Sequence, residues 1–547
     1  MSTLSNLTIA QAATLREISS IAKSSGLTEE EFEPLGRTKG KLTWEGIKRL
    51  QASPQGKLIL VTAITPTPHG EGKTTITVGL SQGLSKIGRT SIPATREPAL
   101  GPIFGTKGGA CGGGYSQVLP MEEINLFFNG DFPAISAAHN LLSAMLDAHL
   151  QHGNALGFDV RRPMWPRTVD MNDRALRQIM VGMGGTANGV PREDGFVITP
   201  ASEIMAVLCL ADSLSDLKKR VGRIIVGMKR DQTPITANDL GATGAMTVLL
   251  KDALRPNLVQ TIEGGPALVH GGPFANIAHG CSSILGTRCA LGLADFCVTE
   301  AGFASDLGAE KFMHIAAPAI GRHPDCIVLV ATVRALKHQG EGDLMVGMEN
   351  LRRHIRHLKN YGPPVVVAIN LFAADLPEEL EQVKEAALKE GADACEIADA
   401  WMSGGEGCRA LAKAVEVHSA KASTFCPLYE PQVTLEEKLT AVVQKAHGGR
   451  GVSFSEDAKK KISWLEKQGM AHLPVCVAKT QNSLSDNPDL LNAPTGFDLN
   501  VREIRVSAGA GFIVCLCGEM MLMPGLSKKP AALQIDLDDE GRITGLF

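Results

Sequence analysis

The stretch Ile64–Thr75, "ITPTPHGEGKTT", contains the residues that decide the fold. It ends in Gly72-Lys73-Thr74, which is also the ending of the phosphate-binding pattern G-x-x-x-x-G-K-[ST]. That pattern begins with a glycine, but this chain has Thr67 at the corresponding position. The first glycine serves the geometry of the loop rather than its chemistry. We therefore expect Thr67 to change the shape of the loop without removing a ligand.

The surroundings of this loop are those that a phosphate-binding loop requires. The run "KLILVTAI" (57–64) predicts a buried strand, and "KTTITVGLSQGLSKIG" (73–88) predicts a helix that Gly88 closes. Backbone N–H groups and the helix N-terminus would attract phosphate oxygens. Lys73 would reach the β- and γ-phosphates, and the Thr74 hydroxyl would hold Mg²⁺. A capped surface turn is the alternative. The expected nucleotide site comprises Thr67, Pro68, His69, Gly70, Glu71, Gly72, Lys73 and Thr74.

The rest of the chain alternates short apolar runs with helical patterns. Further strands are predicted at 295–303, 325–333 and 363–372, and helices at 376–390 and 456–468. This alternation indicates an α/β fold with a mostly parallel sheet, whose ligands bind where strands end. We predict a P-loop-type fold with a large N-terminal domain (1–360), a second α/β domain that contributes two aromatic residues (361–448) and a C-terminal α/β domain (449–547). Pro93 is expected to interrupt the strand before Arg96.

Two further stretches are candidates for substrate binding. "TREPALGPIFGTKGGACGGGY" (95–115) places Arg96 and Glu97 before a loop with six glycines between 105 and 114, through which backbone can approach a ligand. A flexible surface loop is the alternative. Phe372 and Trp401 each stand where a strand is predicted to end, and could enclose a planar ring. Ordinary core packing is the other interpretation of these two aromatics.

Composition excludes several classes of function. A formal net charge of −4 over 547 residues, with 4% aromatics, argues against nucleic-acid binding. No apolar run is long enough for a membrane span, and residues 1–26 form an amphipathic helix rather than a signal peptide. The 12 cysteines include no C-x-x-C pair, which favours reduced thiols and a cytoplasmic location. The pairs His149/His152 and His354/His357 are interpreted as solvated helix faces rather than metal ligands.

Long motifs spread over the whole chain resemble one family. They include "TPTPHGEGKTT", "REPALGPIFGTKGGACGGGY", "PNLVQTIEGGPALVHGGPFANIAHG", "VTEAGF", "VATVRALK" and "SAGAGFIVCLCGEMMLMPGL". These stretches resemble formate–tetrahydrofolate ligases, which also carry threonine at the position of Thr67. The resemblance implies the reaction of ATP, formate and tetrahydrofolate to ADP, phosphate and 10-formyltetrahydrofolate.

The resemblance also implies a role for each candidate residue. Formate would be phosphorylated to formyl phosphate, whose phosphate is a good leaving group when the folate amine attacks. Lys73 and Mg²⁺ would neutralise the transferring phosphoryl group, and Arg96 would hold formate and then formyl phosphate, with Glu97 orienting Arg96. Phe372 and Trp401 would stack on the pterin ring, and Phe303 would lie near the substrate cavity.

The chain departs from the family pattern at a few positions. Leu371 and Ala373 flank Phe372 where the family usually has a basic residue and a proline or phenylalanine, and the stretch 314–345 also differs. The resemblance further implies a homotetramer and stimulation by a monovalent cation such as K⁺ or NH₄⁺. Besides an active ligase, a related ligase with an altered acceptor and an ATP-binding regulatory paralogue remain as alternatives.

Overall fold

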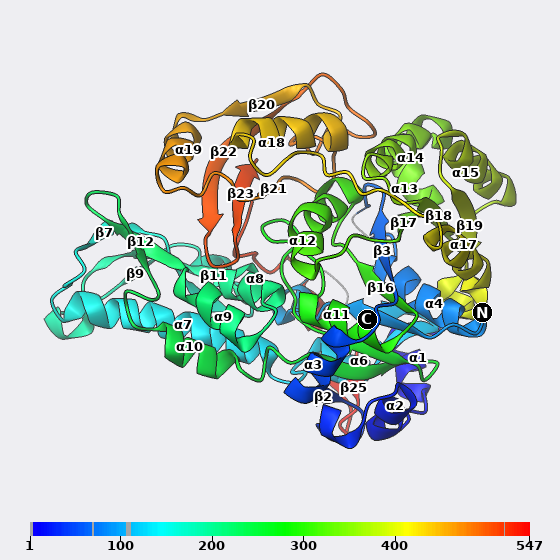
Figure 1. The fold of residues 1–547 in the computed structure, drawn as a ribbon, viewed down its shortest axis with the longest axis horizontal. Helices are drawn as coiled ribbons and strands as arrows, with labels where there is room; N and C mark the ends of the chain where they lie inside the picture. The colour runs from blue at the N-terminus through cyan, green and yellow to red at the C-terminus, as the bar shows by residue number, and fades with distance from the viewer. Residues whose placement is uncertain (1–3, 68–69, 106–110, 519, 547) are drawn as a thin grey trace.

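The fold is built on one large sheet (Figure 1). The computed structural model describes residues 4–67, 70–105, 111–518 and 520–546. Seven parallel strands form the body of the sheet, in the order β15 (Pro266–Val269), β4 (Ser91–Thr95), β16 (Phe296–Glu300), β3 (Lys57–Ala63), β17 (Cys326–Ala331), β18 (Val365–Asn370) and β19 (Ala394–Ala398). The expected α/β class with a mostly parallel sheet is confirmed.

The sheet continues beyond β15 with antiparallel strands. These are β14 (Asn257–Thr261), β2 (Gly40–Leu42) and β1 (Phe32–Pro34), and β14 also pairs with β6 (Ser116–Leu119), which pairs in turn with β5 (Gly112–Gly113). Strand β3 therefore lies well inside the sheet, with its carboxyl end, like those of its parallel neighbours, at one edge.

Both faces of the sheet are covered, as a parallel sheet requires. Successive side chains of β3 alternate between two cores: Leu58 and Leu60 belong to one, Ile59 and Val61 to the other. The first face packs against α3 (Trp44–Ala52), α11 (Ile284–Leu293) and α14 (Leu344–Lys359), and the second against α4 (Lys73–Lys86) and α17 (Arg409–Ser419). This burial on both sides explains why the strand sequences are apolar runs rather than alternating patterns.

Shorter helices complete the large sheet's surroundings. They are α1 (Asn6–Ala12), α2 (Ile18–Ser24), α5 (Leu100–Phe104), α6 (Met121–Asn125), α12 (Ala317–Ile320), α13 (Val333–Gln339), α15 (Pro377–Lys389) and α16 (Ala400–Ser403). Among the described helices, none is long and apolar enough to cross a membrane.

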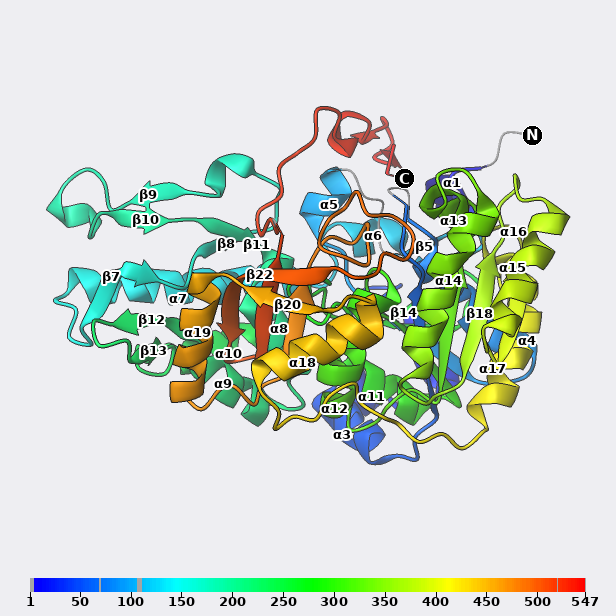
Figure 2. The same cartoon turned by 90° about the horizontal axis from the view of Figure 1, so that it is seen from above.

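Residues 131–250 form a separate group of elements that the strand and helix patterns do not anticipate. Figure 2 shows this group at one end of the molecule, away from β18 and α15. Its helices are α7 (Asp131–Gln151), α8 (Glu203–Leu210), α9 (Leu214–Gly222) and α10 (Thr243–Leu250). Its strands form three small sheets: β7 (Phe158–Pro163) with β12 (Ile225–Lys229) and β13 (Pro234–Thr236), β8 (Arg167–Val169) with β11 (Phe196–Ile198), and β9 (Ile179–Val181) with β10 (Arg192–Asp194).

The C-terminal part has its own four-stranded sheet. Its order is β20 (Gly451–Phe454), β22 (Asp498–Ser507), β23 (Phe512–Cys517) and β21 (Val475–Ala478), and it packs against α18 (Leu435–Val442) and α19 (Glu456–Lys467). A short ladder of β24 (Asp536–Leu537) and β25 (Ile543–Thr544) ends the chain. The division into three domains stays a prediction. Strands β18 and β19, which it assigns to the second domain, are hydrogen-bonded into the first sheet.

Two local predictions are wrong. The expected single helix over 1–26 is two helices, because α1 and α2 bury their apolar residues in different cores: Leu7 in one, Ile18 and Ile21 in the other. The backbone N–H of Arg16, between them, donates to Gln260 Oε1. Pro93 does not interrupt β4. It pairs with Val298 on one side, while β15 pairs with β4 only from Ala94 onward, so the missing N–H of Pro93 is not needed there.

Candidate active site

The predicted phosphate-binding loop connects β3 to α4 at the carboxyl edge of the sheet. Gly70 and Gly72 have φ of 75° and 73°, a region that favours glycine. Gly72 is the N-cap of α4, and a Cβ there would lie 2.4 Å from Nδ2 of Asn370. Helix α4 begins at Lys73, which is half-buried. Both glycines of "GEG" are therefore required by the shape of the turn. Pro68 and His69 lie outside the described residues.

Glu71 holds the loop together, and Thr67 is part of that arrangement. The Thr67 backbone N–H and hydroxyl donate to Oε1 of Glu71 at 2.7 and 2.8 Å. The Glu71 carboxylate is 2% exposed, and its other oxygen accepts from the Thr332 hydroxyl. A glycine at position 67 could not supply the hydroxyl. The threonine thus lacks the conformational freedom of a glycine, but its hydroxyl adds a hydrogen bond to a buried carboxylate.

The outer side of the loop is held from β18 and α13. The Asn370 side-chain N–H donates to the Glu71 carbonyl at 3.1 Å, and Nε of Arg334 lies 3.5 Å from Glu71 Oε2. Arg334 also donates to the carbonyl of Gly70. Side chains from the end of β18 and the start of α13 thus fix the backbone around Gly70 and Glu71, which is the preorganisation that an anion site needs.

Thr74 faces a carboxylate that the sequence analysis did not single out. Its hydroxyl donates to Oε2 of Glu300 at 2.9 Å. Glu300 is the last residue of β16, the strand beside β3, and is 3% exposed. Glu300 falls within the strand predicted over 295–303, whereas β16 ends at Glu300, so the prediction missed its place at the strand end. No local pattern indicated its partner either, because the two residues are 226 positions apart.

The pair Thr74 and Glu300 fits Mg²⁺. This ion prefers oxygen ligands and is usually bound by one or two carboxylates together with substrate phosphates, rather than by a complete protein cage. In keeping with that, the described residues contain no group of three or more His, Cys, Asp or Glu side chains that could hold a metal by themselves. Hydroxyl and carboxylate would therefore need the phosphates of a bound nucleotide to complete the site.

Arg96 follows β4 directly and faces the segment after β15. Its guanidinium donates to the carbonyl of Pro273 at 3.3 Å, and its Nε is buried without a hydrogen-bond partner among the described residues. A buried N–H donor without a partner is costly unless a ligand or water completes it. A planar guanidinium with a spare donor suits a carboxylate or acyl phosphate.

Glu97 points to different neighbours. It is 5% exposed, and burial, followed by the charge of Asp131, raises its pKa well above the usual value. Asp131 forms an ion pair of 2.8 Å with Lys41, and both side chains are buried. Among the described contacts, none joins Glu97 to Arg96, so the orienting role of Glu97 stays a prediction without a supporting contact.

Phe303 lies in a strained turn three residues after β16. Its φ is 59°, which is uncommon for a residue other than glycine and is typical of functional sites. Gly302, before it, donates to the carbonyl of Gly280 at 2.8 Å, and a Cβ on Gly302 would lie 3.3 Å from the Arg96 guanidinium. The segment at the end of β16 thus places Glu300 by the phosphate loop and Gly302 by Arg96.

The two aromatics predicted to stack on a ring are both half-buried. The Arg334 guanidinium lies over the Phe372 ring, 4.2 Å from its centroid. The Trp401 indole N–H donates to Asn6 Oδ1 at 3.0 Å, and its ring packs against the turn at Gly113 and Gly114. Each ring therefore has one covered side. Residues 106–110, in the glycine-rich loop, lie outside the described residues.

The interpretation of His354 and His357 as solvated is wrong. Both lie on the buried side of α14 with 0% exposure, whereas His149 is half-buried and His152 exposed. The spacing of three suggests an exposed helix face because arginines surround these histidines in the sequence. In the fold, the arginines are half-buried or exposed, and the histidines face the first core.

Fold and site together define an α/β protein whose predicted phosphate-binding loop lies at the carboxyl edge of a parallel sheet. The family model described as formate–tetrahydrofolate ligase matches residues 4–547. The chain belongs to this family.

Two full-length relatives carry the name of this family. The chain is 51% identical over 556 residues to a protein named formate–tetrahydrofolate ligase from Fervidobacterium nodosum, and 52% identical over 556 residues to one of the same name from Lactiplantibacillus plantarum. Each alignment covers 100% of both chains. A solved structure, titled as a mutant of "L. casei FPGS", aligns with 70% of this chain and 54% of that chain at 12% identity, and its TM-score of 0.19 is too low to support any argument.

Proposed function

We propose that this protein joins formate to tetrahydrofolate at the expense of ATP, giving 10-formyltetrahydrofolate, ADP and phosphate. The observation that carries the proposal is membership of the formate–tetrahydrofolate ligase family over residues 4–547. It is supported by the start of α4, where Lys73 is followed by Thr74 and the Thr74 hydroxyl contacts Glu300. Formate is a poor acyl donor because oxide is a very poor leaving group. Phosphorylation to formyl phosphate solves this, because phosphate then leaves when the folate amine attacks.

The loop supplies the first half of the reaction. N–H groups at the start of α4 and the ammonium of Lys73 bind the phosphates, and the glycine turn lets the backbone approach them closely. The Thr74 hydroxyl and the Glu300 carboxylate would hold Mg²⁺. When bound, this ion neutralises charge on the transferring phosphoryl group. Glu71 keeps the loop in its binding shape through Thr67.

Residues near the ends of the strands on either side of β3 would take part in the second half of the reaction. Arg96 would pair with formate and then with formyl phosphate through its spare donor. Phe372 and Trp401 would stack on the pterin ring, with Phe303 beside the reacting groups. Positioning the folate amine against the acyl carbon provides most of the remaining rate enhancement.

The family also supports a homotetramer, a cytoplasmic location and stimulation by K⁺ or NH₄⁺ as parts of this proposal. The activity is tested by measuring ADP release with formate and tetrahydrofolate supplied singly and together. Release that requires both substrates supports the ligase. Release that needs formate and another amine would indicate an altered acceptor, and ATP binding without any release would indicate a regulatory protein.

A further inference from the structure

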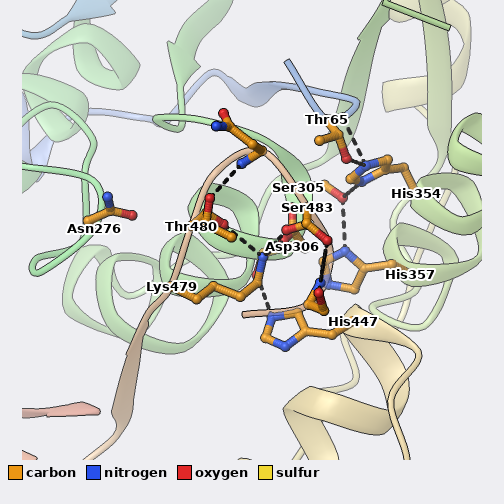
Figure 3. A network of polar contacts seen from close by, with 12 residues as sticks. Thr65, Asn276, Ser305, Asp306, His354, His357, His447, Lys479, Thr480 and Ser483 are labelled. Carbon is orange, nitrogen blue, oxygen red and sulfur yellow. Dashed lines mark hydrogen bonds and ion pairs between the residues drawn. The ribbon is translucent and has the colours of Figure 1, made fainter. Parts of the chain in front are cut away.

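Two buried histidines on α14 meet at a single serine hydroxyl (Figure 3). Ser305 Oγ lies 2.7 Å from Nδ1 of His354 and 2.9 Å from Nδ1 of His357. All three side chains have 0% exposure. Ser305 belongs to the π-helical turn Ser305–Ala309 that follows β16, and such turns are frequent at functional sites. None of the three residues takes part in the proposed chemistry.

The other ring nitrogen of His354 contacts the start of the phosphate-binding loop. Nε2 lies 3.0 Å from the backbone nitrogen of Thr65 and 3.0 Å from its hydroxyl. Thr65 is the second residue after β3 and precedes Thr67 by two positions. The side chain of Asn350, one turn earlier on α14, donates to the same Thr65 hydroxyl at 2.9 Å. Two side chains of α14 therefore hydrogen-bond to the segment that joins β3 to the phosphate-binding loop.

These contacts determine which atom donates and which accepts in each hydrogen bond of the series from Thr65 to His357. The Thr65 backbone N–H can only donate, so Nε2 of His354 must accept. A neutral His354 then carries its proton on Nδ1 and donates it to Ser305. The Ser305 hydroxyl, having accepted, donates to Nδ1 of His357. His357 keeps its own proton on Nε2, 3.4 Å from the Tyr361 hydroxyl. Burial lowers the pKa of His354 to about 4 and that of His357 well below its usual value, so both rings are neutral near pH 7.

The C-terminal part of the chain closes this arrangement from the far side, as Figure 3 shows. Asp306, next to Ser305, forms an ion pair of 2.6 Å with Lys479, whose side chain is fully buried. Lys479 also donates to the carbonyl of Ser483 at 2.6 Å. Asn350 donates to the carbonyl of Asn492 at 2.7 Å. Asp306 and Asn350 are thus each bound to the segment that follows β21.

We propose that His354 is a positioning residue for the phosphate-binding loop. Held as the Nδ1–H tautomer by Ser305 and His357, it presents a fixed acceptor that anchors the backbone of Thr65, and with it the loop that binds the nucleotide. This inference rests on the proposed function, because it assigns the anchored loop to ATP.

The tautomer is tested without any measurement of activity. In protein with ¹⁵N-labelled histidine, the His354 signals are assigned as those lost in His354→Gln. At pH 7 they should show a protonated Nδ1 and an unprotonated Nε2. The two neutral tautomers differ in which ring nitrogen carries the proton, so this spectrum distinguishes them directly. A protonated Nε2, or a charged ring at pH 7, would overturn the proposal.

Two substitutions separate the contacts of the two ring nitrogens. Gln at position 354 can place its carboxamide oxygen near the Nε2 position and still accept from Thr65. The shorter Asn keeps a group near Ser305 but removes the 3.0 Å acceptor of the Thr65 N–H, which then has only the longer contact of 3.3 Å to Asn350 Oδ1. His354→Asn should therefore raise the dissociation constant for ATP roughly tenfold, the effect of losing a buried hydrogen bond, while His354→Gln changes it much less. The Michaelis constant for tetrahydrofolate should be the same in both variants.

His139→Asn is the matched control. His139 is also buried, has a pKa lowered to about 4 by burial, and bonds through both ring nitrogens, to Ser202 and to the Pro166 carbonyl. It lies on α7, away from the loop. This variant should lose stability and keep the ATP constant of the wild type. If it weakens ATP binding as much as His354→Asn, or if His354→Asn leaves ATP binding unchanged, the positioning role is refuted.

Failure of the proposed function would look different. A wild-type chain that binds ATP but makes no 10-formyltetrahydrofolate would refute the ligase reaction, and calorimetric ATP affinities of the variants would still test the role of His354. Unchanged ATP affinity in His354→Asn of a working ligase would refute the positioning role alone.

Discussion

Thr67 donates two hydrogen bonds to the almost completely buried carboxylate of Glu71. One of them comes from the side-chain hydroxyl, which a glycine lacks. Thr67→Gly restores the usual phosphate-loop residue but removes the hydroxyl bond to Glu71. Bonds to charged groups contribute about 1.5–3 kcal/mol, so the Michaelis constant for ATP should rise by roughly tenfold or more. Thr67→Ser keeps the hydroxyl and should stay close to the wild type. Equal constants in the two variants would show that the hydroxyl is dispensable.

Lys73 stands at the first position of α4, where its ammonium adds to the positive end of the helix. Lys73→Ala should reduce turnover by at least ~10², in line with the loss of a main stabiliser of transition-state charge. The circular dichroism spectrum should be unchanged, because the side chain is only half-buried. Turnover near the wild-type value in the folded variant would exclude the loop from catalysis.

Arg96 lies at the end of β4 and contacts the Pro273 carbonyl rather than the phosphate-binding loop. Arg96→Lys keeps the charge but loses the planar pair of donors, so it should not behave as a conservative change. We expect turnover to fall and ATP affinity, measured by calorimetry, to remain within a few-fold. A parallel loss of ATP affinity would place Arg96 in the nucleotide site instead.

The same residues show what the sequence could and could not predict. Lys73, Thr74 and the two loop glycines were named from spacing within one short stretch, and that stretch joins β3 to α4 as expected. Glu300 and His354 contact that stretch from 226 and 289 positions away, so no local pattern could pair them with it. Polar residues at strand ends could be named as candidates, but only the strand order shows which of them meet.

At the scale of elements, apolar runs identified four strands of the parallel sheet, β3, β16, β17 and β18, because each of them is buried on both faces. The helical patterns identified α4 and α15, which follow β3 and β18. Periodicity failed where tertiary contacts decide. The helix expected over 1–26 breaks between α1 and α2, since the two halves pack in different cores. Whether β4 can contain a proline depends on whether a neighbouring strand needs a backbone N–H at that position. The order and register of the sheet decide this, and the sequence of β4 alone does not show it.

The rim formed by the ends of β18 and β19 carries the folate aromatics of the proposed site. Leu371 lacks the positive charge that the family usually has there, but Arg334 lies over the Phe372 ring from α13. An exposed ion pair contributes about 0.2–1 kcal/mol, so the loss at position 371 should raise the Michaelis constant for tetrahydrofolate only a few-fold. Leu371→Arg should lower that constant by the same small factor and leave the ATP constant unchanged. An unchanged folate constant would show that position 371 does not face the folate.

Trp401 provides the sharper test of this rim. Stacking of a base on an aromatic ring contributes about 1–3 kcal/mol, and we apply that scale to a pterin. Trp401→Ala should therefore raise the Michaelis constant for tetrahydrofolate by roughly tenfold or more, with the ATP constant unaffected. Trp401→Phe, which keeps a ring but loses the hydrogen bond to Asn6, serves as the control and should recover most of the affinity. If the folate constant does not change in Trp401→Ala, the tryptophan serves only core packing.

At the scale of the whole molecule, buried ionisable groups make stability depend on pH. Six fully buried histidines have lowered pKa values: about 4 for His139, His270 and His354, about 3 for His279 and His447, and well below the usual value for His357. Burial is the main cause in each case, since it disfavours the charged ring. The unfolded chain, whose histidines titrate near pH 6.5, therefore binds more protons than the folded one between about pH 6.5 and pH 4.

This difference in the number of bound protons determines how the free energy of unfolding changes with pH. Where the unfolded state binds more protons, the free energy of unfolding falls as the pH falls, by about 1.36 kcal/mol for each pKa unit of a single group. Buried carboxyls with raised pKa values, such as Asp170 at about 6 and Glu203 at about 7, act in the opposite sense and offset part of this loss. Because the histidines outnumber them, the urea midpoint should drop steadily from about pH 6.5 to about pH 4.5. A midpoint that stays constant or rises over this range would mean that these histidines reach solvent or gain acidic partners on protonation, contrary to their burial in the fold.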